Sequence, residues 1–183
     1  MKEMSWRKGS ITRVPEGCGA EWLHQIERGK TVVNDLIAGM AQRLGLSLEL
    51  NEDGAGRLVF EDKYAVDIQV LDDEEHRFYL SSTVGQAEAP SEAELKMLLD
   101  ANLFGQGTGE AALAFDQDLE EIVLQRSFDV RFTDLDQLMA ALEEFVNVAA
   151  SWTERLAQQG ADRSRSSAEA TALAQGDPSI LRI

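Results

Sequence analysis

The chain has 183 residues, 44% of them hydrophobic, with 17 basic and 33 acidic residues and a formal net charge of −16. This length and composition suit one globular domain with additional terminal segments. The single cysteine, Cys18, excludes a disulfide within the chain and a cysteine zinc cluster. No apolar run is long enough to cross a bilayer, and no apolar segment follows the basic N-terminal stretch. We therefore expect a cytoplasmic protein without membrane insertion.

The negative charge is concentrated in the middle of the chain. Residues 31–159 hold 8 basic and 26 acidic residues, a net charge of −18, whereas both ends are close to neutral. A field of this sign repels nucleic-acid phosphates and anionic membranes, which argues against both as partners. It suits a basic protein partner, but it is also what a solvated acidic surface needs for solubility. Both interpretations remain open.

The N-terminal part combines irregular and helical patterns. Residues 1–30 are expected to form an arm that is irregular through Gly19 and carries a short helix over Glu21–Gly29. A firmer helix is expected to begin at Thr31 and to end at Gly45, which is placed as a C-terminal cap glycine. Its apolar face has helical spacing. The face comprises Val33, Leu36, Ile37, Met40 and Leu44.

Strand patterns follow this helix. Leu46, Leu48 and Leu50 alternate with polar residues, and turn-forming residues come directly after them. Within the next segment Val66 and Ile68 alternate with polar residues, which is the period of a sheet with one solvated face. Three short strands are therefore expected, at residues 57–60, 65–71 and 77–83.

The central stretch, residues 95–125, predicts a helix, a glycine-rich break and a hairpin. Ser91 and Glu94 form a capping-box pattern at the start of the helix. Glycines at 105, 107 and 109 end it, because glycine adopts positive φ most readily. Two short apolar runs, Ala111–Phe115 and Ile122–Leu124, then flank a polar turn. Nothing in this stretch is a reactive group, and we expect it to be a surface that holds another chain.

The last predicted element is a long helix. Thr133 is expected to cap it, with Asp136 in the capping-box position, and an apolar stripe continues to Leu156. From Gly160 the pattern loses its period, so residues 160–183 are expected to be a disordered tail. The order α-β-β-β-α-β-β-α with short turns predicts an α+β fold: a twisted antiparallel sheet of about five strands with three helices.

Motifs for chemistry are weak. The glycine run at 105–109 lacks the Lys-Ser/Thr ending of a phosphate loop and follows a helix instead of a strand. His24 and His76 have no ligand partners at metal spacing, and Asp72–Glu75 lacks the ligand alternation of a calcium loop. No nucleophile or base has a recognisable signature. The residues therefore give no signature of a catalytic site, a cofactor or a metal, and an enzyme such as a hydrolase that uses an acidic pair remains an alternative with little sequence support.

The residues LLDANLFGQGTGEAALAFD, beginning at Leu98, resemble the central segment of class I chaperones of type III secretion, the Tir-chaperone or CesT-like family. The resemblance extends over residues 31–159, from the first helix to the last. It implies a homodimer that binds the N-terminal chaperone-binding segment of one or more secreted effectors in the bacterial cytoplasm. The client would be kept soluble and competent for export without catalysis.

The resemblance also implies which residues act, with residues 1–30 as the arm, 31–159 as the chaperone domain and 160–183 as the tail. The secretion ATPase is a further candidate partner. A regulatory protein of the same fold, which sequesters a regulator of secretion gene expression, is the alternative function. The implied dimer interface comprises Leu95, Leu98, Leu99, Leu103, Leu113 and Phe115. The implied effector-binding residues are Leu36, Met40, Leu44, Val59, Val66 and Ile68.

Overall fold

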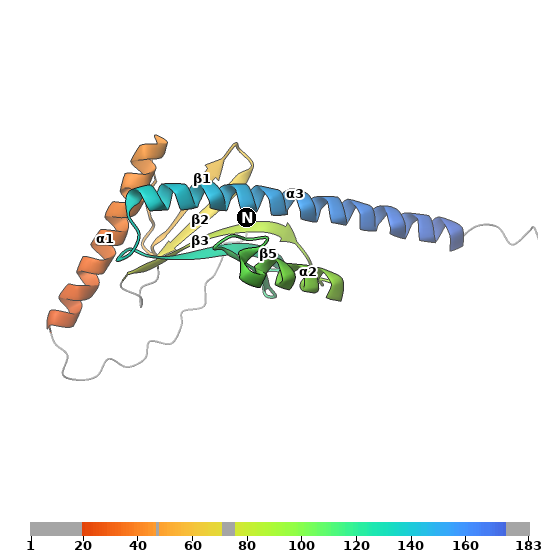
Figure 1. Ribbon diagram of the computed structural model, residues 1–183, viewed down its shortest axis with the longest axis horizontal. Helices are drawn as coiled ribbons and strands as arrows, with labels where there is room; N and C mark the ends of the chain where they lie inside the picture. The colour runs from red at the N-terminus through yellow and green to blue at the C-terminus, as the bar shows by residue number, and fades with distance from the viewer. Residues whose placement is uncertain (1–19, 47, 71–75, 175–183) are drawn as a thin grey trace, which may run out of the picture.

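Three α-helices and one five-stranded sheet make up the computed structural model, which describes residues 20–46, 48–70 and 76–174 (Figure 1). The sheet is antiparallel throughout, in the order β1-β2-β3-β5-β4. This confirms the predicted α+β fold. The elements are α1 Ala20–Leu44, β1 Ala55–Phe60, β2 Tyr64–Val70, β3 Arg77–Gln86, α2 Glu92–Asn102, the 3-10 turn η1 Leu103–Gly105, β4 Ala112–Asp116, β5 Glu121–Asp129 and α3 Leu135–Ala174.

One face of the sheet is covered by α3, and the core lies between them (Figure 1). Along β2, Val66 and Ile68 are buried while Asp67 is half-buried, which confirms the predicted alternation. The apolar stripe on α3 supplies the opposite side of this core, including the fully buried Phe145. Within the sheet, the rings of Phe78 and Phe128 stack with centroids 5.1 Å apart.

The first helix is longer than its sequence pattern predicts. The expected division into a short helix and a second helix capped by Thr31 is wrong, because α1 runs without interruption from Ala20. No proline lies in this segment, and a glycine inside a helix costs only about 1 kcal/mol relative to alanine. The predicted end is confirmed. Gly45 has φ +68°, and the amides of Gly45 and Leu46 donate to the carbonyls of Gln42 and Ala41, which is a Schellman cap.

The leucine alternation after α1 does not mark a strand, because Leu48 and Leu50 lie outside regular structure. Both side chains instead pack against the core. Their methyl groups lie within 3.1 and 2.8 Å of the position that a Cβ on Gly56 would take. The alternation therefore reflects packing over a glycine of β1, where no side chain competes for the space.

The long helix α3 starts and ends differently from the prediction. Asp134, not Thr133, is its N-cap: the Gln137 amide donates to Asp134 Oδ1 at 2.8 Å, and the Asp134 amide donates to Gln137 Oε1 at 2.9 Å. The expected loss of structure at Gly160 is wrong for residues 160–174, which continue the helix. This segment contains no proline and many alanines, so helix propensity sustains it without an apolar face. Residues 175–183, the arm through Gly19 and the acidic turn at 72–75 lie outside the described residues.

Substitutions at Gly160 test the continuity of α3. No atom lies within 4 Å of a Cβ placed there, so Gly160→Ala should stabilise the helix by up to about 1 kcal/mol and raise its helicity. Gly160→Pro should lower helicity, because proline removes a hydrogen bond and clashes with the preceding turn. Far-UV circular dichroism measures both. Identical spectra for the two variants would contradict a helix through residue 160.

Candidate functional site

An apolar surface runs along the outer side of α2, and we call Leu95, Leu99, Leu103 and Phe104 the α2 surface. Their exposed fractions are 39%, 70%, 50% and 92%. Leu95 and Leu99 lie one turn apart on α2, and Leu103, the residue directly after the helix, continues their four-residue spacing as one stripe. Phe104 extends this stripe beyond the helix end. Exposed large apolar side chains that adjoin one another in this way mark an interaction site.

The opposite side of α2 fixes the direction in which this surface points. Leu98 and Ala101 are buried against the core. The predicted capping box is confirmed, since the Glu94 amide donates to Ser91 Oγ and the Ser91 amide donates to Glu94 Oε2. Asn102, the last residue of α2, then binds both the amide and the carbonyl of Leu113 at 2.8 and 2.9 Å. The side-chain amide of Asn102 therefore connects the end of α2 to β4 by two hydrogen bonds.

The glycine-rich segment that follows, residues 105–109, forms a turn that we call the glycine turn. Gly105 and Gly109 have φ of +68° and +60°, and Phe104 has φ +54°, which turns its ring away from the core. A Cβ on Gly107 would lie 2.9 Å from the Ala101 side chain, so only glycine fits there. Trp152 of α3 is 3% exposed and its Nε1 donates to the Gly107 carbonyl at 2.8 Å.

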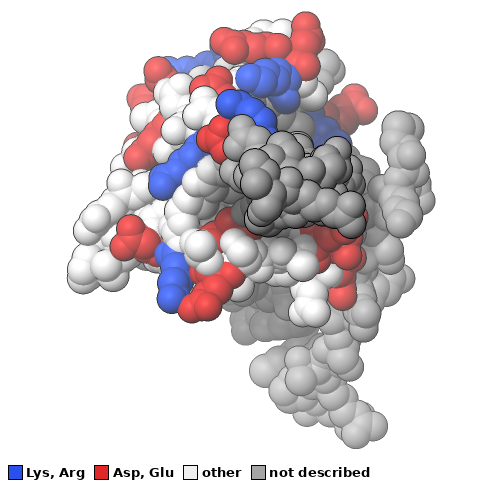
Figure 2. Space-filling model, turned by 90° about the vertical axis from the view of Figure 1, so that its right-hand side faces the viewer, with Lys and Arg blue, Asp and Glu red and all other residues white. Residues whose placement is uncertain are grey.

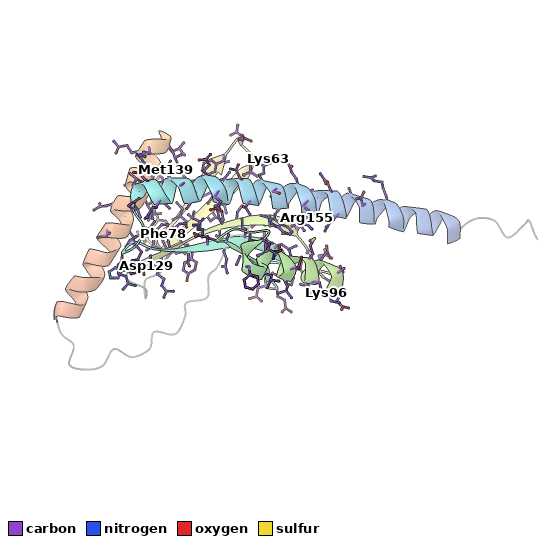
Figure 3. The ribbon with its side chains drawn as sticks, in the orientation of Figure 1. Lys63, Phe78, Lys96, Asp129, Met139 and Arg155 are labelled. Atoms are coloured by element: carbon purple, nitrogen blue, oxygen red, sulfur yellow. The ribbon has the colours of Figure 1, made fainter. Side chains whose placement is uncertain are left out.

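A groove, which we call the α3 groove, lies between α3 and the end of β5. One hollow of about 580 Å³ is bordered by Arg126–Asp129, Phe132 and the first turns of α3. A second hollow of about 500 Å³ shares Ala140 and Glu144 with the first and continues past Gly107 to Ser151. The two together form a channel along α3 that reaches the glycine turn. Figure 3 shows Asp129 at the end of the sheet nearest α1, with Lys96 and Arg155 toward the far end.

Charged side chains cross the middle of this groove. The Arg126 side chain, only 11% exposed, forms ion pairs with Glu110 and with Glu144, the latter at 3.0 Å. Its guanidinium also lies 5.1 Å from the centre of the Phe128 ring. With two glutamates and one arginine, this cluster of three side chains has a net charge of −1. The walls on either side carry the apolar side chains of Phe132 and Val148.

Asp129 and Arg131 form an ion pair beside Phe132. Arg131 Nε and Nη2 donate to the two carboxylate oxygens of Asp129 at 2.9 and 2.5 Å. This hydrogen bonding lowers the pKa of Asp129 to about 2 from its ordinary 3.8. The Arg131 guanidinium also lies 5.5 Å from the centre of the Phe132 ring, which is 78% exposed. An exposed phenylalanine is thus held in place by a paired arginine.

The end of β5 has an open strand edge, which lines the groove. The Val130 amide donates to the His76 carbonyl, so even-numbered residues of this part of β5 bond to β3. The main-chain groups of Ser127 and Asp129 therefore point to the other side, where β4 would continue, but the Asp129 carbonyl already accepts from the Phe132 amide at 3.0 Å. However, β4 begins at Ala112, opposite Gln125. Among the described residues no strand pairs with β5 on this side beyond that point.

The predicted interface residues divide into a surface set and a supporting set. Leu95, Leu99 and Leu103 are on the α2 surface, whereas Leu98 and Leu113 are buried beneath it. Phe115 is half-buried and packs against the core. Phe104 was not among the predicted residues, although it directly precedes the glycine run. That place in the sequence was the available signal, whereas the positive φ of Phe104 is seen only in the structure.

The predicted effector-binding residues do not form one surface. Met40, Val66 and Ile68 have exposed fractions of 0%, 0% and 1%, so the structure corrects their placement from surface to core. Their apolar periodicity marks the face that packs under α3, since the same pattern describes a core face and a binding face. Leu36 and Leu44 are half-buried at the core boundary, and Val59 is 52% exposed. Phe132, which borders the α3 groove, was missed.

Within the described residues, no group of three or more His, Cys, Asp and Glu side chains could hold a metal ion. In the same part of the chain, no helix is both long and apolar enough to span a membrane. On the face seen in Figure 2, acidic and basic side chains lie in several groups with uncharged surface between them.

A family model described as the Tir chaperone protein (CesT) family matches residues 35–153, which is more than half of the chain. The chain belongs to this family. Among its relatives is a protein of Chlamydia pneumoniae that is 28% identical over 128 residues, which are 68% of this chain and 96% of that protein. Family membership explains the element order, and it confirms the resemblance on which the sequence analysis relied.

Solved structures of similar chains include the ExsC–ExsE complex, at 25% identity and a TM-score of 0.59 over 69% of this chain and 94% of that chain. The Yersinia pestis type III secretion chaperone SycH, in complex with a fragment of YscM2, matches at 25% identity with a TM-score of 0.52. That match covers 64% of this chain and 97% of SycH. Each of these two solved chains is therefore matched over nearly its whole length, and the match covers about two thirds of this chain.

The ion pair at the edge of the groove predicts a pH-dependent contribution to stability. Because the folded pKa of Asp129 is lowered, this contribution is fully present above about pH 4 and is lost as the pH falls toward 2. Asp129→Asn should lower the free energy of unfolding at pH 7 by at most about 1 kcal/mol, since solvent screens so exposed a pair. The difference from wild type should disappear near pH 2. Denaturant unfolding at pH values between 2 and 7 measures this difference for Asp129→Asn, Arg131→Gln and the double variant. A difference from wild type that does not change with pH would contradict the assignment of an Asp129–Arg131 ion pair.

Proposed function

We propose that this protein is a cytoplasmic type III secretion chaperone that acts as a homodimer and binds the N-terminal chaperone-binding segment of one or more effectors. It keeps them soluble and competent for export and has no catalytic step. Family membership supports this, as does the likeness to SycH, a type III secretion chaperone solved with a bound fragment. The observation that carries the proposal is the α3 groove, where an open strand edge adjoins apolar walls.

The α2 surface serves self-association in this proposal. A stripe of leucines on one helix is self-complementary under a two-fold axis, because the same patch can meet its copy. Leu98 and Leu113 support the stripe from the core side and give it a rigid base. Phe104, the most exposed large apolar side chain among those that the structure describes, supplies the kind of aromatic side chain that dominates interface energies.

The α3 groove holds the client. An extended segment can add to the open edge of β5, where Ser127 presents its amide and carbonyl and Asp129 its amide, and its side chains then alternate between the sheet side and solvent. Phe132 and Val148 offer apolar contacts along the path. Glu143 and Glu144 favour basic side chains in the client and speed its approach. The client class is therefore an extended segment with apolar and basic residues.

In this proposal, the residues that the family resemblance implies for effector binding have different roles. Met40, Val66 and Ile68 shape the surface from the core, and Leu36, Leu44 and Val59 remain at its boundary. Val59 lies on β1, at the opposite edge of the sheet from the hairpin. A long client that continues around the sheet could reach it, whereas a short one would occupy only the α3 groove.

Charge in the α2 surface should prevent self-association. Leu99→Asp places a carboxylate at the centre of the proposed interface, where burial without a partner costs several kcal/mol. We expect the variant to be monomeric or aggregated at micromolar concentration, by light scattering, while wild type is dimeric. Val59→Asp, at another exposed apolar position on β1 (52% exposed, against 70% for Leu99), is the control and should stay dimeric. A dimer of Leu99→Asp indistinguishable from wild type would remove α2 from the interface.

Co-purification tests the function itself. The tagged chain, expressed in its native bacterium, should retain a protein that is found in the secreted fraction of wild-type cells. Phe132→Asp should weaken this retention by about tenfold or more, because it removes an aromatic contact and adds a charge. Leu119→Asp, on the hairpin turn outside the groove, should leave it unchanged. Retention of a transcriptional regulator in place of a secreted protein would indicate the regulatory alternative.

A further inference from the structure

The α3 groove presents three positions at a regular spacing along α3. Ala140 and Glu144 line both hollows and Val148 lines the second, so a stripe of residues four apart follows the channel. Neighbours in this stripe are roughly 6 Å apart along the helix axis, because the helix rises roughly 1.5 Å per residue. Alternate side chains of an extended segment are separated by a similar distance, roughly 6.6 Å. A client that is held extended and runs along α3 therefore meets the three positions with every second residue.

The first and third of these positions are apolar. At the first, Ala140 has a short side chain and borders the hollow of about 580 Å³ together with Phe128 and Phe132, which leaves room for a large apolar side chain. At the third, Val148 and Gly107 both line the second hollow, and neither carries a polar side chain. Apolar client side chains at these two positions would be removed from water, which favours binding.

The position between them carries a negative charge. The Glu144 carboxylate pairs with Arg126 at 3.0 Å, and it lies so close to Gly109 that a Cβ there would come within 2.5 Å of Oε1. The missing side chain of Gly109 therefore leaves room for this carboxylate beside the arginine. Because Glu110 binds the same guanidinium, a lysine or arginine from a client would bring the charge of the cluster from −1 to zero. The Arg126 side chain is only 11% exposed, and low exposure to solvent strengthens such pairing.

We propose that the α3 groove selects an extended client segment with the pattern apolar–x–basic–x–apolar, whose basic side chain pairs with Glu144 while its apolar side chains lie at Ala140 and Val148. This inference rests on the proposed function, because it gives the client of the same groove a fixed register. A shift of one residue turns the basic side chain away from α3. A shift of two residues places it at an apolar position, where a charge without a partner is unfavourable.

Selection from a displayed library of random peptides, with the full chain as bait, tests the pattern. Peptides retained by wild type should carry it at least about tenfold more often than those retained by Glu144→Gln, in which the acceptor for Arg126 remains but the excess charge is gone. Glu143→Gln removes the same charge from the next residue, which is turned by about 100° on the helix, and should select as wild type does.

Three results of this selection would overturn the proposal. The first is equal enrichment of the pattern by wild type and Glu144→Gln. The second is an equal loss of the pattern in Glu143→Gln and Glu144→Gln, since only the total charge of the groove would then matter. The third is no enrichment by wild type over Phe132→Asp, which adds a charge beside the first apolar position. Thermal unfolding confirms that each variant is folded.

Binding of one selected peptide measures the pairing itself. Replacing the basic residue of the peptide by glutamine should weaken binding to wild type at least about fivefold and should hardly change binding to Glu144→Gln, because the pair is already lost there. Fluorescence anisotropy gives the four dissociation constants of this cycle. Independent, additive effects of the two changes would refute a direct contact between the client's basic side chain and Glu144.

Retention of a native secreted protein separates this proposal from the function on which it rests. If the chain retains a secreted protein but the selected peptides lack the pattern, the register is refuted while the chaperone function stands. If the pattern is selected but no secreted protein is retained, the chaperone function fails and the specificity of the groove stands.

Discussion

The fit of Gly107 between Ala101 of α2 and Trp152 of α3 is the constraint on which both proposed surfaces depend. A side chain at this position would collide with Ala101, and the Gly107 carbonyl is held by the Trp152 indole. The close approach ends α2 at a fixed point relative to α3. It therefore determines where Leu103 and Phe104 emerge on one side and where the groove meets the glycine turn on the other.

The two surfaces are suited to different occupants. The α2 surface presents uncharged leucines and one phenylalanine on a short helix, which favours a copy of itself under two-fold symmetry. The α3 groove combines apolar walls, an Arg126 ion-pair crossing and an open strand edge. Main-chain pairing there tolerates many sequences, while the acidic side chains favour basic segments. A chaperone with one fixed partner, itself, and extended clients needs both kinds of surface.

Sequence reasoning predicted the elements whose signals are local. The capping box of Ser91 and Glu94, the cap at Gly45 and the glycine end of α2 depend on a few neighbouring residues, and the structure confirms them. The continuity of α1 through Thr31 and the extension of α3 beyond Gly160 were missed, because helix propensity without an amphipathic pattern gives no periodic signal. Gly160 in particular carries the helix onward although it is the usual helix breaker.

The surfaces were predicted less well than the elements, for a physical reason. A helical or alternating pattern shows which residues share a face, but not whether that face is covered. The family resemblance implied that Met40 and Ile68 lie on a client surface, but both side chains are buried in the core. The open edge of β5 exists because β4 begins only at Ala112, opposite Gln125, while β5 continues to Asp129, and only the strand register shows this. Family resemblance supplied the interface helix, which periodicity alone did not.

The dimer dissociation constant of Trp152→Phe, measured by sedimentation beside wild type, tests the dependence of the α2 surface on the glycine turn most directly. The ring of phenylalanine fills much of the same space but cannot donate to the Gly107 carbonyl, which loses a buried hydrogen bond. We expect a folded protein whose dimer dissociates at least about tenfold more readily, because Leu103 and Phe104 are no longer held in place. A folded variant that dimerises as tightly as wild type would contradict the account.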